Sequence, residues 1–443
     1  MNFDYFCTDD VNFLSYKNKI LTFKAFFEEV EKISKKFNYF SESNDFILIN
    51  EENPIDFYIL LFALWKNDKK VVFPNKDFLN GASFSFVKYI ITFEKIIKNS
   101  EYRYLNLQDG DTVLFSSGST GQPKGILHKK ESFIENAKNV QERISFHCLV
   151  SVTPLKPYLV SALSHFLVHL LSRSHLHFVD IEDLKSIEEL SCQYNNLSYL
   201  GSPMHILSMM PYIKNRQPDL FFSSGDIFYP SVIKDIIDLY PKTIFFNVYG
   251  MAELAGRLFI NKIENHNSVN TYKCIGMPLS SMNIKIHENE VLVKSDLLFK
   301  GYIVNEAFHK RDEKHFASGD KVIQVDNHYE FYGRKNDEIK VAGNKVSMKY
   351  IEQKISLILD DSITPIIVNE EHSLIGNILV LILYMANKKK VSRTDILKQL
   401  REGMKSEELP HKIYLINEIP YTQTMKIDRK KIALELQNME LLR

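Results

Sequence analysis

Residues 114–125 read LFSSGSTGQPKG, an apolar start followed by glycine, serine, threonine and one lysine. Glycine permits a positive φ and a close approach of the backbone to a ligand. Successive N–H groups in such a loop form a concave anion site, to which the hydroxyls and Lys124 add donors and positive charge. The stretch is not a Walker A loop, because Lys124 follows Pro123 and precedes Gly125. It predicts a strand leading into a loop for the phosphates of a nucleotide. The alternative is a surface loop of similar composition.

Segments with strand and helix patterns alternate on both sides of this loop. Their periodicity and their β-branched and aromatic content define the expected elements. We expect helices at 22–37, 53–67 and 129–144, and a further helical stretch that follows the strand at 175–180 and ends at about residue 191. The expected strands are 45–50, 69–75, 111–117, 175–180, 197–203, 220–226 and 242–250. This alternation is typical of a parallel sheet with helices on its faces.

The pattern changes twice toward the C-terminus. From about residue 271 the strands become shorter, as in 282–295 and 321–333, which indicates a β-rich subdomain. A charged segment follows Arg334, and beyond it strands alternate with a helix as in a small α+β domain. We therefore predict an α/β protein. Residues 1–333 form a large N-terminal domain of parallel and mixed sheets packed with helices, plus the β-rich subdomain, and residues 334–443 form a small C-terminal α+β domain.

Composition excludes several classes of protein. Of the 443 residues, 45% are hydrophobic and 25% charged, which excludes a mainly disordered chain. Lys+Arg and Asp+Glu both number 55, so the basic excess typical of nucleic-acid binding is absent from the total, although a local patch would escape this count.

Cysteine spacing and hydropathy suggest a compartment. Cys7, Cys148, Cys192 and Cys274 form no CxxC pair, so we expect neither a disulfide framework nor structural zinc. The start, MNFDYFCTDD, lacks the pattern of a signal peptide. The longest apolar stretches fall short of the roughly 20 residues that span a bilayer. We expect a soluble cytoplasmic protein with neither nucleic-acid nor membrane partners.

Four further motifs carry residues suited to nucleotide chemistry. NVYGMAE (247–253) offers a tyrosine ring that can stack on a purine and a carboxylate that can hold Mg²⁺. In ASGDKV (317–322), the carboxylate of Asp320 can accept two hydrogen bonds from a vicinal diol. Arg334, in YGRKNDEIKVAGNKV (332–346), provides a cationic fork, and PYTQTMKIDRKKI (420–432) contains Lys426. Each residue taken alone is also typical of an ordinary turn or surface.

Taken in this order, the five motifs resemble those of the adenylate-forming superfamily. Its members include acyl-CoA synthetases, aryl-acid ligases, luciferases and amino-acid adenylation domains. The resemblance extends from about residue 22 to residue 432. It implies that a carboxylic acid reacts with ATP to give an acyl-adenylate and pyrophosphate, after which the acyl group passes to a thiol. It also implies a C-terminal domain that moves about a hinge near 334–337.

The resemblance assigns roles to individual residues. Lys426, Thr120 and Glu253 are the catalytic residues it implies, and Thr120 and Glu253 would hold Mg²⁺. Tyr249 would take the adenine, Asp320 the ribose and Arg334 the ribose and phosphate. The residues implied to bind ATP are Ser116, Ser117, Gly118, Ser119, Thr120, Gly121, Lys124, Tyr249, Gly250, Asp320 and Arg334. Two positions depart from the family pattern, because Asn336 replaces a hinge aspartate and Met425 replaces the glycine before Lys426.

The acceptor and the acid are less specified. No phosphopantetheine site or carrier module follows residue 432, so we expect CoA or a separate acyl carrier protein as acceptor. TPLKPYLVSAL (153–163) lacks the FD of amino-acid-activating members, whereas SSGDIFYP (223–230) resembles their GGD variant. Arg257 would pair with an acidic or hydroxylated substrate, or form a surface salt bridge instead. For His205 we expect a structural role, as a cap or a filler, rather than a catalytic one. The predicted acid pocket comprises Lys156, Tyr158, Met204, His205, Ser224, Val248, Gly256 and Arg257.

Three functions remain open at this point. The first is an acid–thiol ligase acting on an acyl or aryl acid. The second is a stand-alone amino-acid ligase that loads a carrier protein. The third is a nucleotide-binding scaffold without catalysis, which the departures at Asn336 and Met425 motivate. The sequence leaves open the identity of the acid and whether the protein is a monomer or a dimer.

Overall fold

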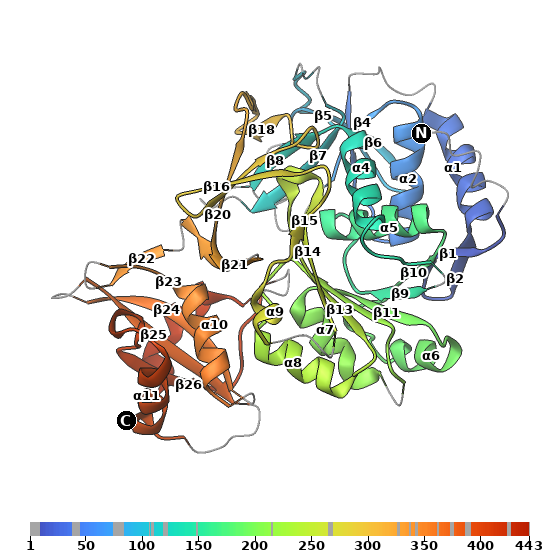
Figure 1. Ribbon diagram of the computed structural model, residues 1–443. Helices are drawn as coiled ribbons and strands as arrows, with labels where there is room; N and C mark the ends of the chain where they lie inside the picture. The colour runs from blue at the N-terminus through green and yellow to red at the C-terminus, as the bar shows by residue number, and fades with distance from the viewer. Residues whose placement is uncertain are drawn as a thin grey trace.

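The computed structural model describes most of the chain, in segments separated by short gaps. These segments are residues 9–37, 45–73, 84–105, 107, 110–117, 123–147, 149–213, 216–264, 269–325, 328–335, 338–341, 344–360, 363–372, 376–385, 391–422 and 427–442. Their strands form four sheets. Three belong to the larger N-terminal part, and the fourth lies beside it in a smaller C-terminal body (Figure 1).

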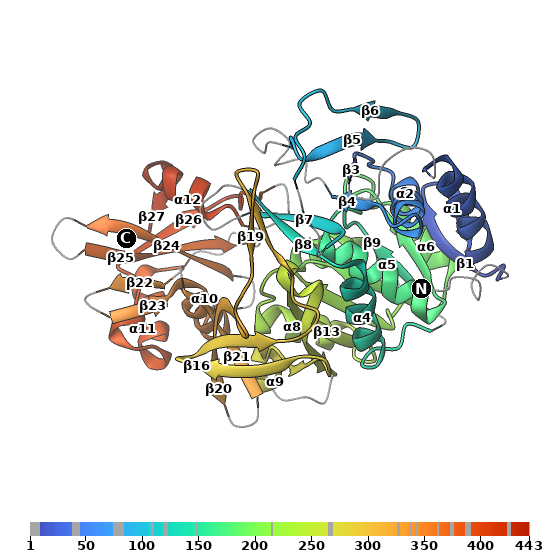
Figure 2. The same cartoon turned by 90° about the horizontal axis from the view of Figure 1, so that it is seen from above.

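The first sheet has the strand order β19-β18-β8-β7-β4-β3-β5-β6. Its strands are β3 (Phe46–Ile49), β4 (Lys70–Val72), β5 (Val87–Ile91), β6 (Ile96–Lys98), β7 (Thr112–Ser117), β8 (Pro123–His128), β18 (Gly301–Val304) and β19 (Ala307–Lys310). Strands β5, β3, β4 and β7 run parallel, and β8 returns antiparallel to β7. This hairpin is the one that contains the glycine-rich stretch. Figure 2 shows it between the N-terminal helices and the C-terminal body.

The second sheet has the order β15-β14-β13-β12-β11-β9-β10-β1-β2. Its strands are β1 (Asn12–Tyr16), β2 (Lys19–Thr22), β9 (Val150–Thr153), β10 (His175–Phe178), β11 (Leu197–Gly201), β12 (Leu220–Ser224), β13 (Ile244–Met251), β14 (Gly256–Ile263) and β15 (Met277–Pro278). The strands from β1 to β13 in this order are parallel, and β2, β14 and β15 pair antiparallel at the edges. Ligands bind at the carboxyl edge of such sheets.

Helices fill the space between these two sheets and cover the outer face of the second. Residues of α1 (Phe23–Phe37), α2 (Pro54–Lys66), α4 (Lys130–Gln141) and α5 (Val160–Ser172) share one apolar core with both sheets. Residues of α6 (Ser186–Gln193), α7 (Pro203–Met209) and α8 (Pro230–Leu239) belong to a second core. Figure 1 shows these three helices, with α9 (Val269–Lys273), below the second sheet.

Local sequence explains why these helices form where they do. The apolar side chains of α1 recur every three or four residues, so one face of the helix is buried. Helix α2 begins at Pro54, where proline's fixed φ suits the first turn. The side chain of Asn53 caps it, because its oxygen accepts the N–H of Ile55 at 3.0 Å. Nearly all of α2 is buried, as expected of a helix that is apolar on every side.

The third sheet is the β-rich subdomain expected beyond residue 271. It is antiparallel, in the order β16-β17-β20-β21. Its strands are β16 (Asn283–His287), β17 (Glu290–Lys294), β20 (Phe316–Val325) and β21 (His328–Arg334). Glu288 and Asn289 join the first two strands, and both have positive φ, as a tight hairpin turn requires. This sheet holds Asp320 and Arg334 on neighbouring strands.

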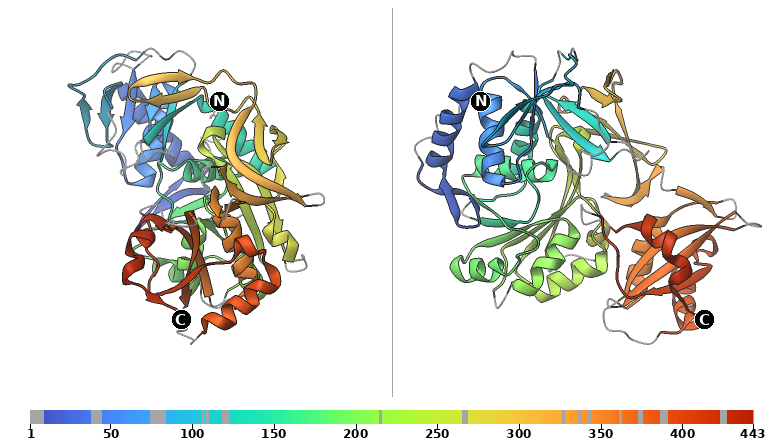
Figure 3. Two further views of the ribbon diagram at one scale, coloured as in Figure 1. Left: turned by 90° about the vertical axis from the view of Figure 1, so that its left-hand side faces the viewer. Right: turned by 180° about the vertical axis from the view of Figure 1, so that it is seen from behind.

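The fourth sheet contains only strands that follow Arg334. Its strands are β22 (Glu338–Val341), β23 (Asn344–Ser347), β24 (Ile363–His372), β25 (Gly376–Met385), β26 (Lys412–Ile416) and β27 (Glu440–Leu441). The helices of the same C-terminal body are α10 (Met348–Ile358), α11 (Arg393–Gly403) and α12 (Arg429–Glu435). Two apolar cores lie within this body. Both views of Figure 3 show it next to the larger part. The expected α/β fold class is confirmed. Every helix of the described segments is too short or too polar to cross a membrane.

Candidate active site

The glycine-rich stretch forms the end of the β7–β8 hairpin. Ser116 lies opposite Lys124 in the ladder, and Ser117 opposite Pro123. Lys124 is therefore a strand residue, although we expected it in the loop. Its Nζ lies 5.6 Å from the centre of the Tyr302 ring, close enough for a cation–π contact. The predicted phosphate ligands Gly118, Ser119, Thr120 and Gly121 lie outside the described residues.

Glu253 lies beside this hairpin. It belongs to a short 3₁₀ turn, Ala252–Leu254, which follows β13. The hydroxyl of Tyr302 donates a hydrogen bond to Glu253 Oε1 at 3.1 Å. Burial raises the pKa of Glu253 above its usual range. Tyr302 lies on β18 and pairs with Ile126 of β8, so one side chain contacts both the hairpin lysine and the acid.

A second cluster forms around the carboxylate of Asp320. The hydroxyl of Tyr249 donates to one carboxylate oxygen, and Arg334 Nε donates to the other at 3.0 Å. Asp320 and Arg334 are direct partners in the β20–β21 ladder, and the Asp320 residue is only 2% exposed. Burial raises the pKa of Tyr249 well above its usual range, and the charge of Asp320 raises it further. A carboxylate accepts about four hydrogen bonds, so Asp320 has capacity left for a diol.

The strand expected at 242–250 is β13, which extends one residue further, to Met251. The pairing of β13 with β14 continues to Met251, so Tyr249 and Gly250 are strand residues with an irregular register between them. A side-chain carbon added at Gly250 would lie 2.1 Å from the carbonyl oxygen of Gly256. Only glycine permits this close approach of the two strands.

Among the residues predicted for the acid pocket, Arg257 and Ser224 contact each other. Arg257 Nη1 donates to Ser224 Oγ at 2.7 Å, and Val248 lies beside Ser224 in the β12–β13 ladder. Gly256 precedes Arg257 and has a φ of +141°. Arg257 is 3% exposed, so the alternative of a surface salt bridge is wrong.

The other predicted pocket residues are spread more widely. The ring of His205 accepts the N–H of Ser202 at 3.2 Å, which caps α7 and gives His205 a structural role. Burial lowers the pKa of His205 to about 4. Met204 is half-buried on the same helix, Tyr158 is half-buried against the main core, and Lys156 is exposed.

The chain is similar to known proteins over most of its length. The model of a family described as AMP-binding enzyme matches residues 92–303. The match spans a little less than half of the chain.

Curated relatives and solved structures match most of the chain. The D-alanine–D-alanyl carrier protein ligase of Staphylococcus haemolyticus is 24% identical over 361 residues, which are 74% of this chain and 72% of the relative. The structure of o-succinylbenzoate CoA synthetase (MenE) from Bacillus subtilis with the acyl-adenylate OSB-AMP has a TM-score of 0.76 and 16% identity, and the match covers 96% of this chain and 95% of that one. ATP-bound MatB from Rhodopseudomonas palustris has a TM-score of 0.77 and 14% identity, covering 98% and 99%. At these identities the structures show the fold alone.

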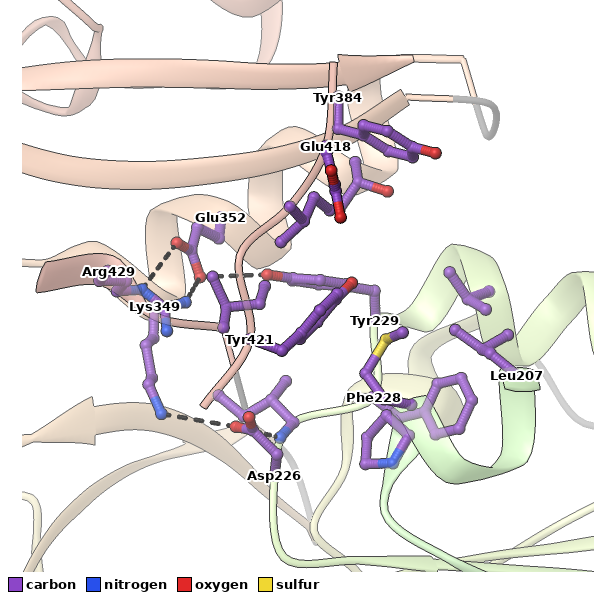
Figure 4. A pocket seen from close by; sticks show the side chains of 17 residues that line it. Leu207, Asp226, Phe228, Tyr229, Lys349, Glu352, Tyr384, Glu418, Tyr421 and Arg429 are labelled. Atoms are coloured by element: carbon purple, nitrogen blue, oxygen red, sulfur yellow. Dashed lines mark hydrogen bonds and ion pairs between the residues drawn. The ribbon is translucent and has the colours of Figure 1, made fainter. Parts of the chain in front are cut away.

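A cavity of about 420 Å³ lies between the two parts of the protein (Figure 4). Met204, Phe228 and Tyr229 line it from the N-terminal part, and Tyr421 and Ile427 are among the residues that line it from the C-terminal part. Tyr421 and Ile427 also form an isolated antiparallel bridge. Residues 423–426, which include Lys426, lie between them and are outside the described residues. Tyr421 and Ile427, on either side of this segment, both line the cavity.

Charged and polar contacts join the two parts at this cavity. The hydroxyl of Tyr229 donates to Glu352 Oε2 at 3.1 Å, and Arg429 Nη2 donates to the same oxygen at 2.6 Å. Lys349 Nζ lies 3.6 Å from Asp226 Oδ1. Figure 4 shows these groups converging from both sides. The arrangement fixes the C-terminal body next to the carboxyl edge of the second sheet.

The residues present fit a bound magnesium ion. The described residues contain no group of three acidic, cysteine or histidine side chains that would hold a metal by itself. Mg²⁺ in nucleotide sites commonly takes only one or two carboxylates and completes its shell with phosphates and water. Glu253, next to the β7–β8 hairpin, is the described carboxylate that suits this role.

Sequence reasoning missed several residues of these clusters. Tyr302 and Glu352 lie outside the parts of the motifs that we singled out, and Arg429 was quoted without a role. Their contacts span 49 residues for Tyr302–Glu253 and 77 residues for Arg429–Glu352. The spacing of residues along the chain contains no signal for such contacts.

Proposed function

We propose that this protein activates a carboxylic acid with ATP and transfers the acyl group to a thiol. The observation that carries the proposal is the pair of neighbouring clusters, Lys124–Tyr302–Glu253 and Tyr249–Asp320–Arg334. They provide a cation for phosphates, an acid for a metal ion, and an aromatic ring and a carboxylate for a nucleoside. The carrier protein ligase and the acyl-adenylate complex among its relatives support the same chemistry.

In the first step, a carboxylate oxygen of the acid attacks the α-phosphorus of ATP. The bond from that phosphorus to the bridging oxygen breaks, and pyrophosphate leaves with the electron pair. Residues 116–121 and Lys124 hold the phosphates, and Lys426 stabilises charge on the carboxylate and phosphate oxygens. Glu253 and Thr120 would hold Mg²⁺, which would supply neutralisation of the phosphate charge.

The nucleoside is held by the second cluster. The ring of Tyr249 contacts the adenine beside Gly250, and Asp320 accepts the ribose hydroxyls. Arg334 orients Asp320 through their 3.0 Å hydrogen bond, and we assign it also to the ribose-phosphate. Its side chain is 59% exposed, so a ligand can reach it.

In the second step, a thiol attacks the acyl carbon and AMP leaves. CoA or the phosphopantetheine of a separate carrier protein is the acceptor, and the C-terminal domain turns about the segment near 334–337 between the steps. The side of the site that binds the acid consists of Lys156, Tyr158, Met204, His205, Ser224, Val248, Gly256 and Arg257. We place the reaction in the cytoplasm, where thiols stay reduced.

The substitution Lys426→Ala tests the proposal. We expect loss of acid-dependent exchange between ATP and pyrophosphate, with ATP binding retained. The matched control is Lys430→Ala, because Lys430 is an exposed lysine of the neighbouring helix α12. Unchanged exchange in Lys426→Ala would refute the role of this lysine. Absence of exchange in the unmodified protein with a broad panel of acids, while ATP still binds, would favour a nucleotide-binding scaffold instead.

A further inference from the structure

The guanidinium of Arg257 is buried without a carboxylate partner. It is 3% exposed, and none of the ion pairs among the described residues includes it. Its hydrogen bonds go to neutral groups, namely Ser224 Oγ at 2.7 Å, Ser161 O at 3.2 Å and His165 Nε2 at 3.2 Å. Its Nε is buried and has no hydrogen-bond partner in the part of the chain that the structure describes. The guanidinium therefore has hydrogen-bonding capacity that the described side chains do not use.

This site carries an uncompensated positive charge. Burial lowers the pKa of Arg257 to about 9, so the side chain is still protonated at neutral pH. His165 accepts from Arg257 and is therefore neutral, and burial holds the pKa of His165 well below its usual range. The ring of Phe222, 5.0 Å from Cζ, adds a favourable but weak cation–π contact. A buried charge without a counter-charge is costly, and an anion from outside the chain would remove that cost.

The position of Arg257 relates it to the proposed acid site. Ser224 ends β12 at the carboxyl edge of the parallel sheet, and Arg257 lies opposite Gly250 in the β13–β14 ladder. Gly250 follows Tyr249, which we assign to the adenine. The guanidinium thus lies at the edge where the acid must approach the nucleotide.

We propose that Arg257 binds a second anionic group of the acid, so that the substrate is a dicarboxylic acid. The inference rests on the proposed function. One carboxylate of the substrate reacts with ATP, and the other pairs with the Arg257 fork, which suits the planar geometry of a carboxylate. An α-amino acid is disfavoured, because its ammonium group would enter a site that is already positive.

A panel of matched acids tests this assignment. Each set contains an aliphatic or aromatic dicarboxylic acid, its monomethyl ester and the amino acid in which an ammonium replaces the second carboxylate. The readout is kcat/KM for acid-dependent exchange between ATP and pyrophosphate. We expect at least one diacid to exceed its monoester by about 30-fold or more, the lower bound for losing one partner of a buried charge pair. The difference falls on KM, because the second group is bound equally before and during the reaction.

Variants separate binding from a purely structural role. Arg257→Met should bring the diacid and monoester within about threefold of each other, while Arg257→Lys keeps part of the preference. The control is Arg143→Met, which removes an exposed arginine and should leave the preference unchanged. Thermal denaturation shows whether each variant folds.

The outcomes are distinguishable. Equal or better activity of the unmodified protein with monoesters or amino acids overturns the inference and leaves the proposed function intact. If none of the acids supports exchange while ATP still binds, the proposed function is overturned and the inference with it. If Arg257→Met fails to fold, the acid panel on the unmodified protein and the Arg257→Lys variant decide the question.

Discussion

Arg429→Met should destabilise the C-terminal body, because the buried carboxylate of Glu352 loses its charged partner. Glu352 is buried, its side chain only 2% exposed, and Arg429 Nη2 lies 2.6 Å from its Oε2. The other donors to this carboxylate are the N–H of Ile367 at 2.7 Å and the hydroxyl of Tyr229 at 3.1 Å. Neither is charged, so the substitution leaves a buried negative charge without a counter-charge.

The magnitude follows from the burial of the two partners. Removing one member of a buried pair costs about 3–5 kcal/mol. The Arg429 side chain is 26% exposed, which screens part of the interaction. We therefore expect the lower end, about 3 kcal/mol, which corresponds to roughly a 150-fold change in an opening equilibrium. The double variant Glu352→Gln with Arg429→Met should recover most of this loss, because it leaves no buried charge.

Hydrogen exchange provides the assay. The amides of α10 and β24 report the stability of the C-terminal body, and the fluorescence of Trp65, the single tryptophan, reports the N-terminal part. We expect exchange in α10 and β24 to accelerate by about two orders of magnitude while the urea midpoint of Trp65 fluorescence hardly changes. Protection of α10 and β24 within about threefold of the unmodified protein would refute the role of the ion pair.

Two further predictions concern metal binding and pH. Tyr302→Phe removes the donor to Glu253, a loss of about 1.5–3 kcal/mol for a charged acceptor. The Mg²⁺ concentration for half-maximal exchange should then rise about tenfold or more, and an unchanged Mg²⁺ dependence, measured beside an exposed-tyrosine control, Tyr104→Phe, would contradict this. His128 and His169 are buried, and burial lowers the pKa of each to about 4. Because these values lie below the unfolded pKa of about 6.5, each contributes stability above pH 6.5 that is lost as the pH falls toward 4, up to about 3 kcal/mol each. Urea denaturation at pH 7 and pH 4.5 measures this loss, and equal free energies of unfolding at both would contradict it.

Local sequence patterns predicted most of the elements near the site. The apolar spacing of 22–37 and the β-rich runs at 111–117 and 220–226 correspond to α1, β7 and β12, because these patterns reflect burial on one face or within a sheet. The ends of strands were harder to place. We expected a strand at 242–250, whereas cross-strand pairing places β13 at Ile244–Met251, and such pairing depends on residues outside the strand itself.

The partners and the burial of the charged residues in the site could not be predicted from the sequence. The presence of Asp320 and Arg334 in motifs predicted their importance, but their direct pairing follows from the β20–β21 register. For Arg257 we considered a surface salt bridge, whereas the structure buries it among neutral groups from α5 and β12. Burial and the absence of a partner depend on the packing of the whole domain, and no local pattern reports them.

Isotope transfer from the acid to AMP tests the central claim most directly. The purified protein is given ATP, Mg²⁺, CoA or a carrier protein, and an acid whose carboxylate oxygens are ¹⁸O. If an acyl-adenylate forms, the bond between the acyl carbon and the bridging oxygen breaks in the second step, so mass spectrometry finds one ¹⁸O in the AMP phosphate. Formation of ADP with ¹⁸O in inorganic phosphate would indicate an acyl phosphate instead. That result, or AMP without ¹⁸O while thioester accumulates, would contradict the account.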